Sequence, residues 1–342
     1  MTPKNSITRE EQQTCRSLKP TGTKRPTLFV AAVILLSLLP TMPVSASDTP
    51  VTPAGTYKFA QRDTADLFLD IYDPAPGSAT TLDGKDKPTV IFMFGGGFIY
   101  GTRNDTAYLP WFRLLTENGY RVVSIDYRLG LKGATKVGIA QVNVLDRTIH
   151  MAVEDLFSAT AFIIEHAEEL GVDPANMVIS GSSAGAITVM QAEYELCNKT
   201  VWAQTLPDGF RYAGVMSFSG AIFSRKGKVH YGESPAPTLL LHGTGDAIVP
   251  YTHIRFFHLG FFGSGKLVER FEKFGYSYNM YHFVDYGHEI AGAMIETFDL
   301  QIKFLETNVM RGQKRIVEAW IDDPDIRRAT GIQSRKELYK GG

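Results

Sequence analysis

The sequence predicts an α/β fold in which a mostly parallel sheet is covered by helices on both faces. From about Tyr57 onward, short β-rich runs alternate with helical stretches, the order expected when helices connect parallel strands. The continuous apolar runs VIFM, VVSI and LLL are typical of strands buried on both sides. A composition of 44% apolar and 21% charged residues over 342 positions is that of an ordinary globular protein.

The expected strands are short, and most are bounded by Gly, Pro, Asn or Asp, which favour turns. They cover Leu67–Tyr72, Val90–Met93, Val122–Asp126, Met177–Ser180, Gly214–Ser219, Thr238–Leu241 and Met280–Val284. The clearest helix runs from Thr148 to Leu170, where apolar residues recur at helical spacing and Gly171 follows the end. This helix is expected to pack on the sheet.

Two segments lie outside this alternation. The stretch from Leu129 to Leu145 is rich in glycine and fits neither a strand nor a helix. Because an insertion of this length usually has a function, we expect it to line a substrate entrance together with residues around Phe98 to Tyr108. The charged tail after about Gly312, which contains DDPD, is expected to form a peripheral helix-turn extension or a loosely attached end over residues 313–342.

The strongest local signal is the pentapeptide GSSAG, whose central residue is Ser183. The strand-like MVIS precedes it and the helix-like AITVMQAEYEL follows it. A serine presented on a sharp strand-to-helix turn needs small residues on both sides. The pentapeptide alone is a weak signal, but its setting makes Ser183 the candidate nucleophile at a helix N-terminus.

A serine hydroxyl is a weak nucleophile at neutral pH and needs a base to take its proton. Asp246, in LLLHGTGDAIVP, and His288, in YHFVDYGHEI, each follow an expected strand. The order serine, acid, histidine is the one expected for this fold. We expect His288 to accept the proton of Ser183 and Asp246 to hold the imidazole in place.

Other residues compete for these two roles. Asp285 lies very close in sequence to His288, and Asp126 precedes the serine and is expected to anchor a loop. Among the remaining histidines, only His242 sits at a strand end. Because it shares that strand with Asp246, we interpret it as a structural, hydrogen-bonding residue.

The loop FGGGF directly follows the strand VIFM. Consecutive glycines allow backbone N–H groups to approach a substrate closely. We therefore expect Gly96 and Gly97, with the N–H of Ala184, to form an oxyanion hole, in which each donor typically contributes about 3 kcal/mol. The sequence contains no recognisable metal cluster, phosphate loop or dinucleotide fingerprint, so neither a cofactor nor a metal is expected.

Together, FGGGF, IDYRLG, AVEDLFSA, GVDPANMVISGSSAG, LLLHGTGDAIVP and YGHEI resemble the carboxylesterase and acetyl- or feruloyl-esterase branch of the α/β-hydrolases. The resemblance extends from about Leu67 to Leu305. It implies the α/β-hydrolase fold, with an eight-stranded and mostly parallel sheet. Its site residues map onto Ser183, Asp246, His288, Gly96, Gly97 and Ala184. The family usually has His before the three glycines, where this chain has Phe94, so its oxyanion loop must be braced differently.

The resemblance implies a serine hydrolase that cleaves carboxylic esters through an acyl-enzyme. The expected substrates are short-chain or aromatic acyl esters of carbohydrates or small alcohols. One alternative is a peptidase of the prolyl-oligopeptidase type, although that group normally carries an N-terminal propeller. Another is a non-catalytic binding protein on the same scaffold, which would generally lack a triad member. The net charge of −1 predicts no basic surface for phosphates, so nucleic acid is not an expected partner.

The N-terminus predicts export. Basic residues up to Arg25 precede the apolar run Leu28–Leu39, and Pro40 and the small residues Val44-Ser45-Ala46 follow. This order is typical of a secretory signal peptide, here residues 1–46. The run is shorter than the roughly 18 apolar residues of a spanning helix. We therefore expect a secreted or periplasmic catalytic domain over residues 47–312, without stable membrane insertion after cleavage.

The chain contains two cysteines. Cys15 lies in the expected signal peptide and would be removed, so Cys197 could form no intrachain disulfide. Because Cys197 follows an apolar helical stretch, it is expected to be a small core residue.

Overall fold

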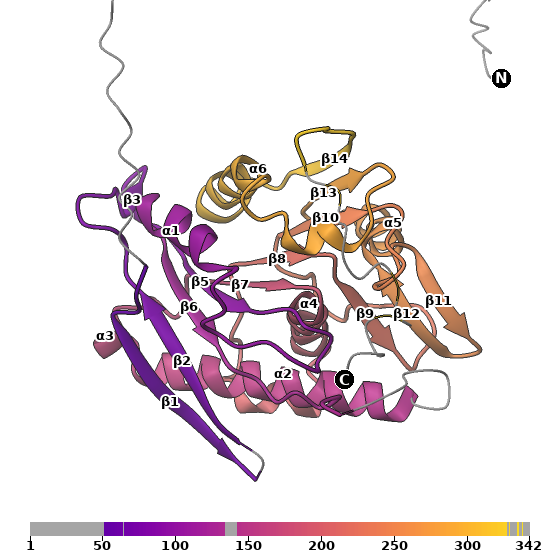
Figure 1. The fold of residues 1–342 in the computed structure, drawn as a ribbon, viewed down its shortest axis with the longest axis horizontal. Helices are drawn as coiled ribbons and strands as arrows, with labels where there is room; N and C mark the ends of the chain where they lie inside the picture. The colour runs from indigo at the N-terminus through magenta and orange to yellow at the C-terminus, as the bar shows by residue number, and fades with distance from the viewer. Residues whose placement is uncertain are drawn as a thin grey trace, which may run out of the picture. The chain divides into compact units, whose positions relative to one another are not determined.

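The computed structural model describes residues 51–326 except 64 and 134–141, and also residues 328, 334 and 337. The chain divides into two units, residues 1–48 and residues 49–342. The first unit, which holds the whole expected signal peptide, lies outside the described residues. In the second unit a large sheet is covered by helices (Figure 1). No helix of the described part is long and apolar enough to cross a membrane.

The main sheet has the strand order β1-β2-β6-β5-β7-β8-β10-β13-β14. Its strands are β1 (Gly55–Arg62), β2 (Ala65–Tyr72), β5 (Thr89–Met93), β6 (Arg121–Ile125), β7 (Met177–Ser182), β8 (Gly214–Phe218), β10 (Thr238–Gly243), β13 (Tyr278–Phe283) and β14 (Ile316–Ile321). Only the β1–β2 and β2–β6 pairs of this sheet are antiparallel. All seven expected strands are present, and their ends differ from the expected ones by no more than two residues.

Two smaller sheets accompany the main one. An antiparallel sheet of order β11-β12-β9 contains β9 (Ala221–Ser224), β11 (His253–Phe256) and β12 (Leu259–Gly263), and β3 (Thr81–Leu82) pairs with β4 (Lys85–Asp86). The α-helices are α1 (Leu109–Glu117), α2 (Val142–Glu165), α3 (Ala167–Leu170), α4 (Ala184–Cys197), α5 (Ser264–Phe274) and α6 (Phe298–Phe304). Two 3₁₀-helices, η2 (Val201–Thr205) and η3 (His288–Gly292), and a π-helix, η4 (Leu305–Met310), accompany them. In Figure 1, α1 and α6 lie on one side of the main sheet, and α2 and α4 lie on the other.

The C-terminal segment corrects the sequence-based expectation. The segment after Gly312 is expected to be a peripheral helix-turn extension or a loosely attached end, but β14 joins the main sheet in parallel with β13. The resemblance implies eight strands, whereas the main sheet has nine, and β14 occupies one edge. Its residues alternate between exposed and half-buried, the pattern of an edge strand. The short run IVEAWI has strand-like composition, but its charged surroundings conceal it.

The long helix also differs from the expectation. It begins at Val142 rather than Thr148, and it breaks at His166 before α3. The last four residues of the expected insertion are therefore helical, while residues 134–141 lie outside the described part of the chain. Tertiary contacts hold this first turn, since Arg225 Nε donates to Asp146 at 2.7 Å. Gly171 ends α3 in the left-handed region, with φ 60°, as its place in the sequence predicts.

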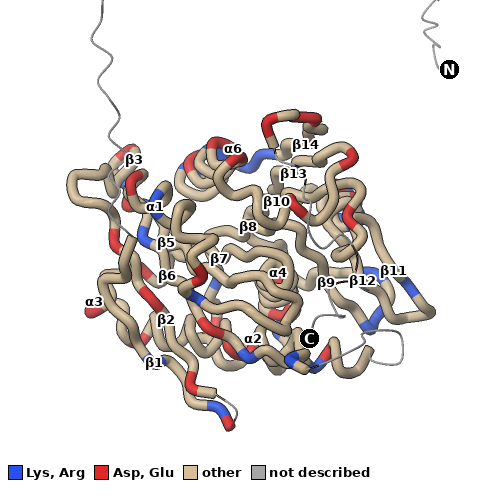
Figure 2. Tube along the Cα trace, in the orientation of Figure 1, with Lys and Arg blue, Asp and Glu red and all other residues tan. Residues whose placement is uncertain are grey.

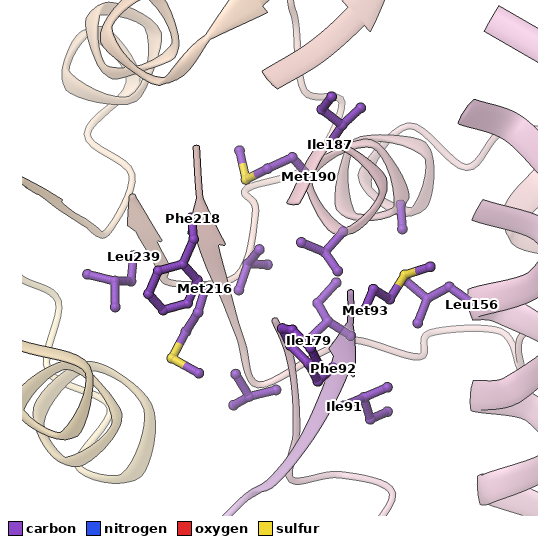
Figure 3. Packing of buried hydrophobic residues seen from close by; sticks show 14 of the residues in the cluster. Ile91, Phe92, Met93, Leu156, Ile179, Ile187, Met190, Met216, Phe218 and Leu239 are labelled. Atoms are coloured by element: carbon purple, nitrogen blue, oxygen red, sulfur yellow. The ribbon is translucent and has the colours of Figure 1, made fainter. Parts of the chain in front are cut away.

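The core fills both faces of the main sheet. On one face the ring of Phe92 meets Trp111 and Phe112 of α1 edge-on, with centroids 5.1 and 5.4 Å apart. Figure 3 shows other strand side chains gathered with Leu156 of α2 and Met190 of α4. Full burial of one such side chain contributes about 2 kcal/mol. This packing holds the carboxyl ends of the central strands rigidly, so the loops that follow them have defined positions.

Candidate active site

Ser183 lies on the sharp turn between β7 and α4. Its backbone has φ 50° and ψ −113°, a conformation that a residue with a side chain rarely adopts. The Ser183 N–H donates to the carbonyl of Phe218 on the neighbouring strand β8 at 2.9 Å. Such strain persists only where the surroundings enforce it, and here it presents the hydroxyl at the carboxyl edge of the sheet.

The glycines of GSSAG allow this turn because the chain comes too close for any side chain. A Cβ added at Gly181 would lie 2.3 Å from the carbonyl carbon of Gly185. A Cβ added at Gly185 would lie 2.1 Å from the carbonyl oxygen of Met93 on β5. Real Cβ contacts are never this short. The pattern therefore reflects the packing of α4 against the ends of two parallel strands.

The structure brings Ser183, His288 and Asp246 together, although they come from three separate loops. The Ser183 hydroxyl lies 2.7 Å from Nε2 of His288, and Nδ1 of His288 lies 2.7 Å from Oδ2 of Asp246. Because a carboxylate only accepts hydrogen bonds, Nδ1 carries the proton and Nε2 is left to accept. This is the tautomer that a general base for Ser183 requires.

The Asp246 carboxylate is buried and fully engaged. Its Oδ1 accepts the N–H groups of Ile248 and Val249, each at 2.9 Å. Its Oδ2 faces His288 and also Nε2 of His242, which lies 3.3 Å away. Burial acts to raise the pKa of the Asp246 carboxyl, but hydrogen bonds from His242 and His288 outweigh burial and bring this pKa well below its ordinary value. Asp246 therefore stays ionised at neutral pH.

His242 is completely buried and held in one tautomer. Its Nε2 lies 3.2 Å from the carbonyl of Val249 and close to Asp246, and both of these only accept. Nε2 must therefore carry the proton, and Nδ1 accepts from the Ser264 hydroxyl at 2.9 Å. His242 is the structural residue that the sequence indicates, and in addition it contacts the carboxylate that orients His288.

Replacing His242 with leucine is expected to lower kcat about fivefold with little change in KM. The substitution removes one of the N–H groups that fix the Asp246 carboxylate beside His288, at a cost of about 1 kcal/mol. The measurement is steady-state ester hydrolysis at neutral pH, with His282→Leu as the matched control.

His282 suits this comparison because it pairs with His242 across neighbouring strands. It hydrogen-bonds Tyr251 and Glu318 rather than Asp246. Equal kcat values for the two variants would show that His242 does not act through Asp246.

The glycine loop after β5 provides backbone donors beside Ser183. Gly96 has φ 115°, and a Cβ there would lie 2.0 Å from the carbonyl oxygen of Tyr100. The N–H of Gly95 is already bonded to the Tyr108 hydroxyl at 3.0 Å. Within the described residues no hydrogen bond is recorded for the N–H of Gly96 or Gly97. The N–H of Ala184, the first residue of α4, has no partner inside the helix.

Two tyrosines brace this loop. Phe94 occupies the position at which the family that this chain resembles usually has histidine. The Tyr127 hydroxyl donates to the carbonyl of Phe94 at 2.9 Å, and the two rings stack with centroids 4.4 Å apart. The Tyr108 hydroxyl accepts from Gly95 and hydrogen-bonds Ser182. Burial raises the pKa of both phenols, so both remain protonated donors. The brace that a histidine would supply therefore comes from two other segments.

Replacing Tyr127 with phenylalanine is expected to lower kcat about tenfold with little change in KM. The buried Phe94 carbonyl loses its donor, at a cost of about 1–2 kcal/mol, and the adjacent N–H groups lose their fixed position. Steady-state kinetics and urea unfolding test this expectation. Tyr212→Phe is the matched control, because it removes a buried hydroxyl bonded to Thr160, away from the site. Equal kcat values for the two variants would contradict the bracing role.

A pocket of about 350 Å³ opens above these residues. Its lining includes Ser183, His288, Gly96, Gly97, Tyr100 and Tyr108. The expectation that residues around Phe98 to Tyr108 line an entrance agrees with this lining. None of the described residues between 129 and 145 lines the pocket, and residues 134–141 lie outside the description. Groups of His, Cys, Asp or Glu able to hold a metal ion are absent from the described residues.

The alternative acids are placed elsewhere. Asp126 accepts from Arg103 at 2.8 Å and from the N–H of Phe68, so it anchors a loop as expected. Asp285 lies in a turn, where its backbone N–H donates to the Thr244 hydroxyl at 2.9 Å, while Nδ1 of His288 is bonded to Asp246 instead. Cys197 is free and buried. Sequence reasoning placed Tyr108 only at the substrate entrance, and it did not single out Tyr127; the bracing role of both was missed. The signal in the sequence for Tyr127 is its position two residues after β6, the strand that pairs with β5.

Several known proteins and one family model are similar to this chain. The BD-FAE family model matches residues 69–201. Lipase 2 of Moraxella sp. (strain TA144) is 28% identical over 126 residues, which are 37% of this chain and 25% of the lipase. Esterase E4 of Myzus persicae is 31% identical over 123 residues, which are 36% of this chain and 21% of the esterase. The chain therefore spans a quarter or less of the length of these two relatives.

Solved structures match over a much larger share. Thermogutta terrifontis esterase 2 phosphoramylated by tabun superposes with a TM-score of 0.54 and 22% identity, covering 75% of this chain and 96% of the esterase. The propionate-bound form of this esterase has a TM-score of 0.53 and 22% identity, covering 74% and 94% of the two chains. At this level of identity the likeness concerns the fold.

Proposed function

We propose that this chain, which has the α/β-hydrolase fold, hydrolyses carboxylic esters through an acyl-enzyme on Ser183. One observation carries the proposal, namely the continuous hydrogen-bond chain from Ser183 through His288 to Asp246, with 2.7 Å at each step. These three residues lie beside the glycine loop and its backbone N–H groups, and Ser183 and His288 line an accessible pocket. The esterases and lipases to which the chain is similar support the same activity.

The proposed reaction has two stages. In the first, Ser183 Oγ attacks the ester carbonyl carbon while its proton passes to Nε2 of His288. The carbonyl oxygen becomes an oxyanion that the N–H groups of Gly96, Gly97 and Ala184 stabilise. His288 then donates the proton to the alkoxide oxygen, the alcohol leaves, and the acyl group stays on Ser183.

In the second stage a water molecule attacks the acyl carbon. His288 removes a proton from this water and returns it to Ser183 Oγ as the carboxylic acid departs. Asp246 stays ionised throughout and stabilises the imidazolium in both stages. No metal or cofactor is part of this scheme.

The proposed acyl group is short-chain or aromatic, and the alcohol is a carbohydrate or another small alcohol. A pocket of about 350 Å³ with Tyr100 and Tyr108 in its wall suits an acyl group of this size. Asp105 adds a polar side chain to the same wall and could accept hydrogen bonds from sugar hydroxyls. Propionate- and butyrate-bound forms of Thermogutta terrifontis esterase 2 support short acyl chains.

The test is turnover by the wild-type protein together with covalent labelling. We expect release of p-nitrophenol from p-nitrophenyl acetate and labelling of Ser183 by a fluorophosphonate, located by peptide mass spectrometry. Turnover of a proline-containing dipeptide amide without ester cleavage would instead indicate a peptidase of the prolyl-oligopeptidase type. Absence of both turnover and labelling in folded protein would indicate a non-catalytic binding protein. A series of acyl lengths, acetylated xylan and methyl ferulate would then define the substrate.

We further propose that residues 1–46 direct export and are removed. The apolar run Leu28–Leu39 and the small residues ending at Ala46 support this. The N-terminal sequence of protein recovered from outside the cytoplasm should begin near residue 47. Recovery of the intact N-terminus would contradict cleavage.

A further inference from the structure

A second pocket lies at the three-stranded sheet and α5. It has a volume of about 350 Å³ and shares no lining residue with the pocket at Ser183. Five of its lining side chains are cationic, namely Lys228, Arg255, Lys266, Arg270 and Lys273. Figure 2 shows blue segments around β11 and β12. Three separate stretches of the chain supply these residues, so folding concentrates positive charge that the chain's net charge of −1 does not indicate.

Within the described part of the chain these cations have few negative partners. Of the described residues that line the pocket, Glu269 is the one carboxylate, and it pairs with Lys266. Arg255 Nε donates to the carbonyl of Phe257, and Arg270 Nε donates to that of Val229, each at 2.9 Å. These carbonyls hold the two guanidinium groups in position without neutralising them. Like charges gathered on one surface repel, and an anionic partner would relieve this repulsion.

Exposed apolar side chains accompany the charges. On the β11–β12 hairpin, Ile254 is 43% exposed, Phe256 53% and Phe257 77%. Phe274, at the end of α5, is 43% exposed, and Arg270 lies over its ring at 4.9 Å from the centroid. We call these four side chains, together with the five cations of the pocket, the hairpin surface. Soluble proteins rarely gather large apolar side chains on their surface without a function.

We propose that the hairpin surface docks on a membrane that contains anionic phospholipids. Arg255, Arg270 and their neighbours would contact lipid phosphates, and Phe256 and Phe257 would enter the headgroup region. Basic and aromatic side chains together are typical of proteins that lie on a membrane without crossing it. The proposal is independent of ester hydrolysis, because no residue of the hairpin surface lines the pocket at Ser183.

A lipid surface explains the observations better than an anionic polysaccharide does. A polyanion would satisfy the cations through its charges, but it would leave Ile254, Phe256 and Phe257 largely in water. The backbone of β11 alternates its side chains, so His253 and Arg255 face the pocket while Ile254 and Phe256 point to the opposite side. One bilayer can contact both sets if the hairpin enters it tip first, with Phe257 of the β11–β12 turn leading. The interface then surrounds both sides of the hairpin tip with phosphates and apolar acyl chains.

The experiment is cosedimentation of the full chain with phosphatidylcholine vesicles, prepared with and without phosphatidylglycerol. We expect binding only when phosphatidylglycerol is present, and weaker binding at high salt. Arg255→Gln combined with Arg270→Gln should weaken binding roughly 30-fold, from about tenfold per 1.4 kcal/mol and about 1 kcal/mol per charge. Phe256→Ser combined with Phe257→Ser should weaken it at least about tenfold without any change in charge.

The matched control combines Lys58→Gln with Lys303→Gln, which removes the same charge from exposed positions elsewhere. Hydrolysis of a soluble ester by each variant shows that it is folded. Equal binding of the arginine variant and the control, or equal binding to both vesicle types, would overturn the proposal. So would binding to polygalacturonate without vesicle binding, or self-association that the phenylalanine variant abolishes while vesicles are not bound.

Discussion

Ser183→Ala is expected to lower kcat for p-nitrophenyl acetate by about six orders of magnitude. His288 would then have no hydroxyl to deprotonate, and no acyl-enzyme could form. The fold should be unchanged, because alanine keeps the backbone hydrogen bond from residue 183 to Phe218. The measurements are kcat under saturating ester and fluorophosphonate labelling, which should disappear together.

The neighbouring serine provides the control for this prediction. Ser182 also sits in GSSAG, but its hydroxyl donates to the carbonyl of Ala291 at 2.8 Å and does not contact His288. Ser182→Ala should therefore keep fluorophosphonate labelling and lose about tenfold in kcat or less, through a slightly looser histidine loop. A Ser183→Ala protein as active as the Ser182→Ala protein would refute the assignment of the nucleophile.

Asp246→Asn is expected to lower kcat by about four orders of magnitude. Oδ1 of Asp246 accepts two backbone N–H groups, so the asparagine oxygen should occupy that position. The amide NH₂ would then face the protonated nitrogens of both His288 and His242, which also donate. His288 can relieve this conflict only by moving its proton to Nε2, and it then can no longer accept from Ser183.

Asp285→Asn tests the rival carboxylate with the same chemical change. Asp285 lies in a turn near His288, where its backbone N–H bonds Thr244, and this variant should retain nearly full activity. Equal losses in the two variants would show that the effect of Asp246→Asn is not specific to the tautomer of His288.

The lowered pKa of Asp246 also predicts how this substitution affects stability. A carboxyl whose pKa is lower in the folded chain than in the unfolded chain stabilises the fold above the unfolded value of about 3.9. This contribution is lost as the pH falls toward the folded-state pKa. The difference in free energy of unfolding between the wild type and Asp246→Asn should therefore be constant near neutral pH and shrink below about pH 4. Urea unfolding at several pH values measures it.

Some residues of the candidate site could be predicted from the sequence and others could not. Ser183, Asp246 and His288 each follow a buried apolar strand within a short pattern, and parallel strands place their carboxyl ends at one edge. Local patterns were therefore sufficient to select them. Tyr108 and Tyr127 carry no such pattern, because their roles depend on which carbonyl or N–H each hydroxyl faces across the fold.

The ends of helices and strands likewise depend partly on local residues and partly on tertiary contacts. Expected strand ends are close to the observed ones because turn-forming residues mark them locally. The start of α2 was missed because Arg225, far along the chain, holds Asp146 in its first turn. The strand β14 was missed because it forms only where β13 offers an unpaired edge.

By itself, the sequence determined the order of strands and helices, the turn that presents Ser183 and the loops that carry Asp246 and His288. These features depend on periodicity, glycine and turn chemistry within short stretches. Only the tertiary structure decided how the glycine loop is braced without a histidine, that His242 contacts Asp246, and that scattered cations gather beside an exposed aromatic hairpin. Hydrogen bonds and charge interactions act over a few ångströms in space, and residues that meet at such distances are often far apart along the chain.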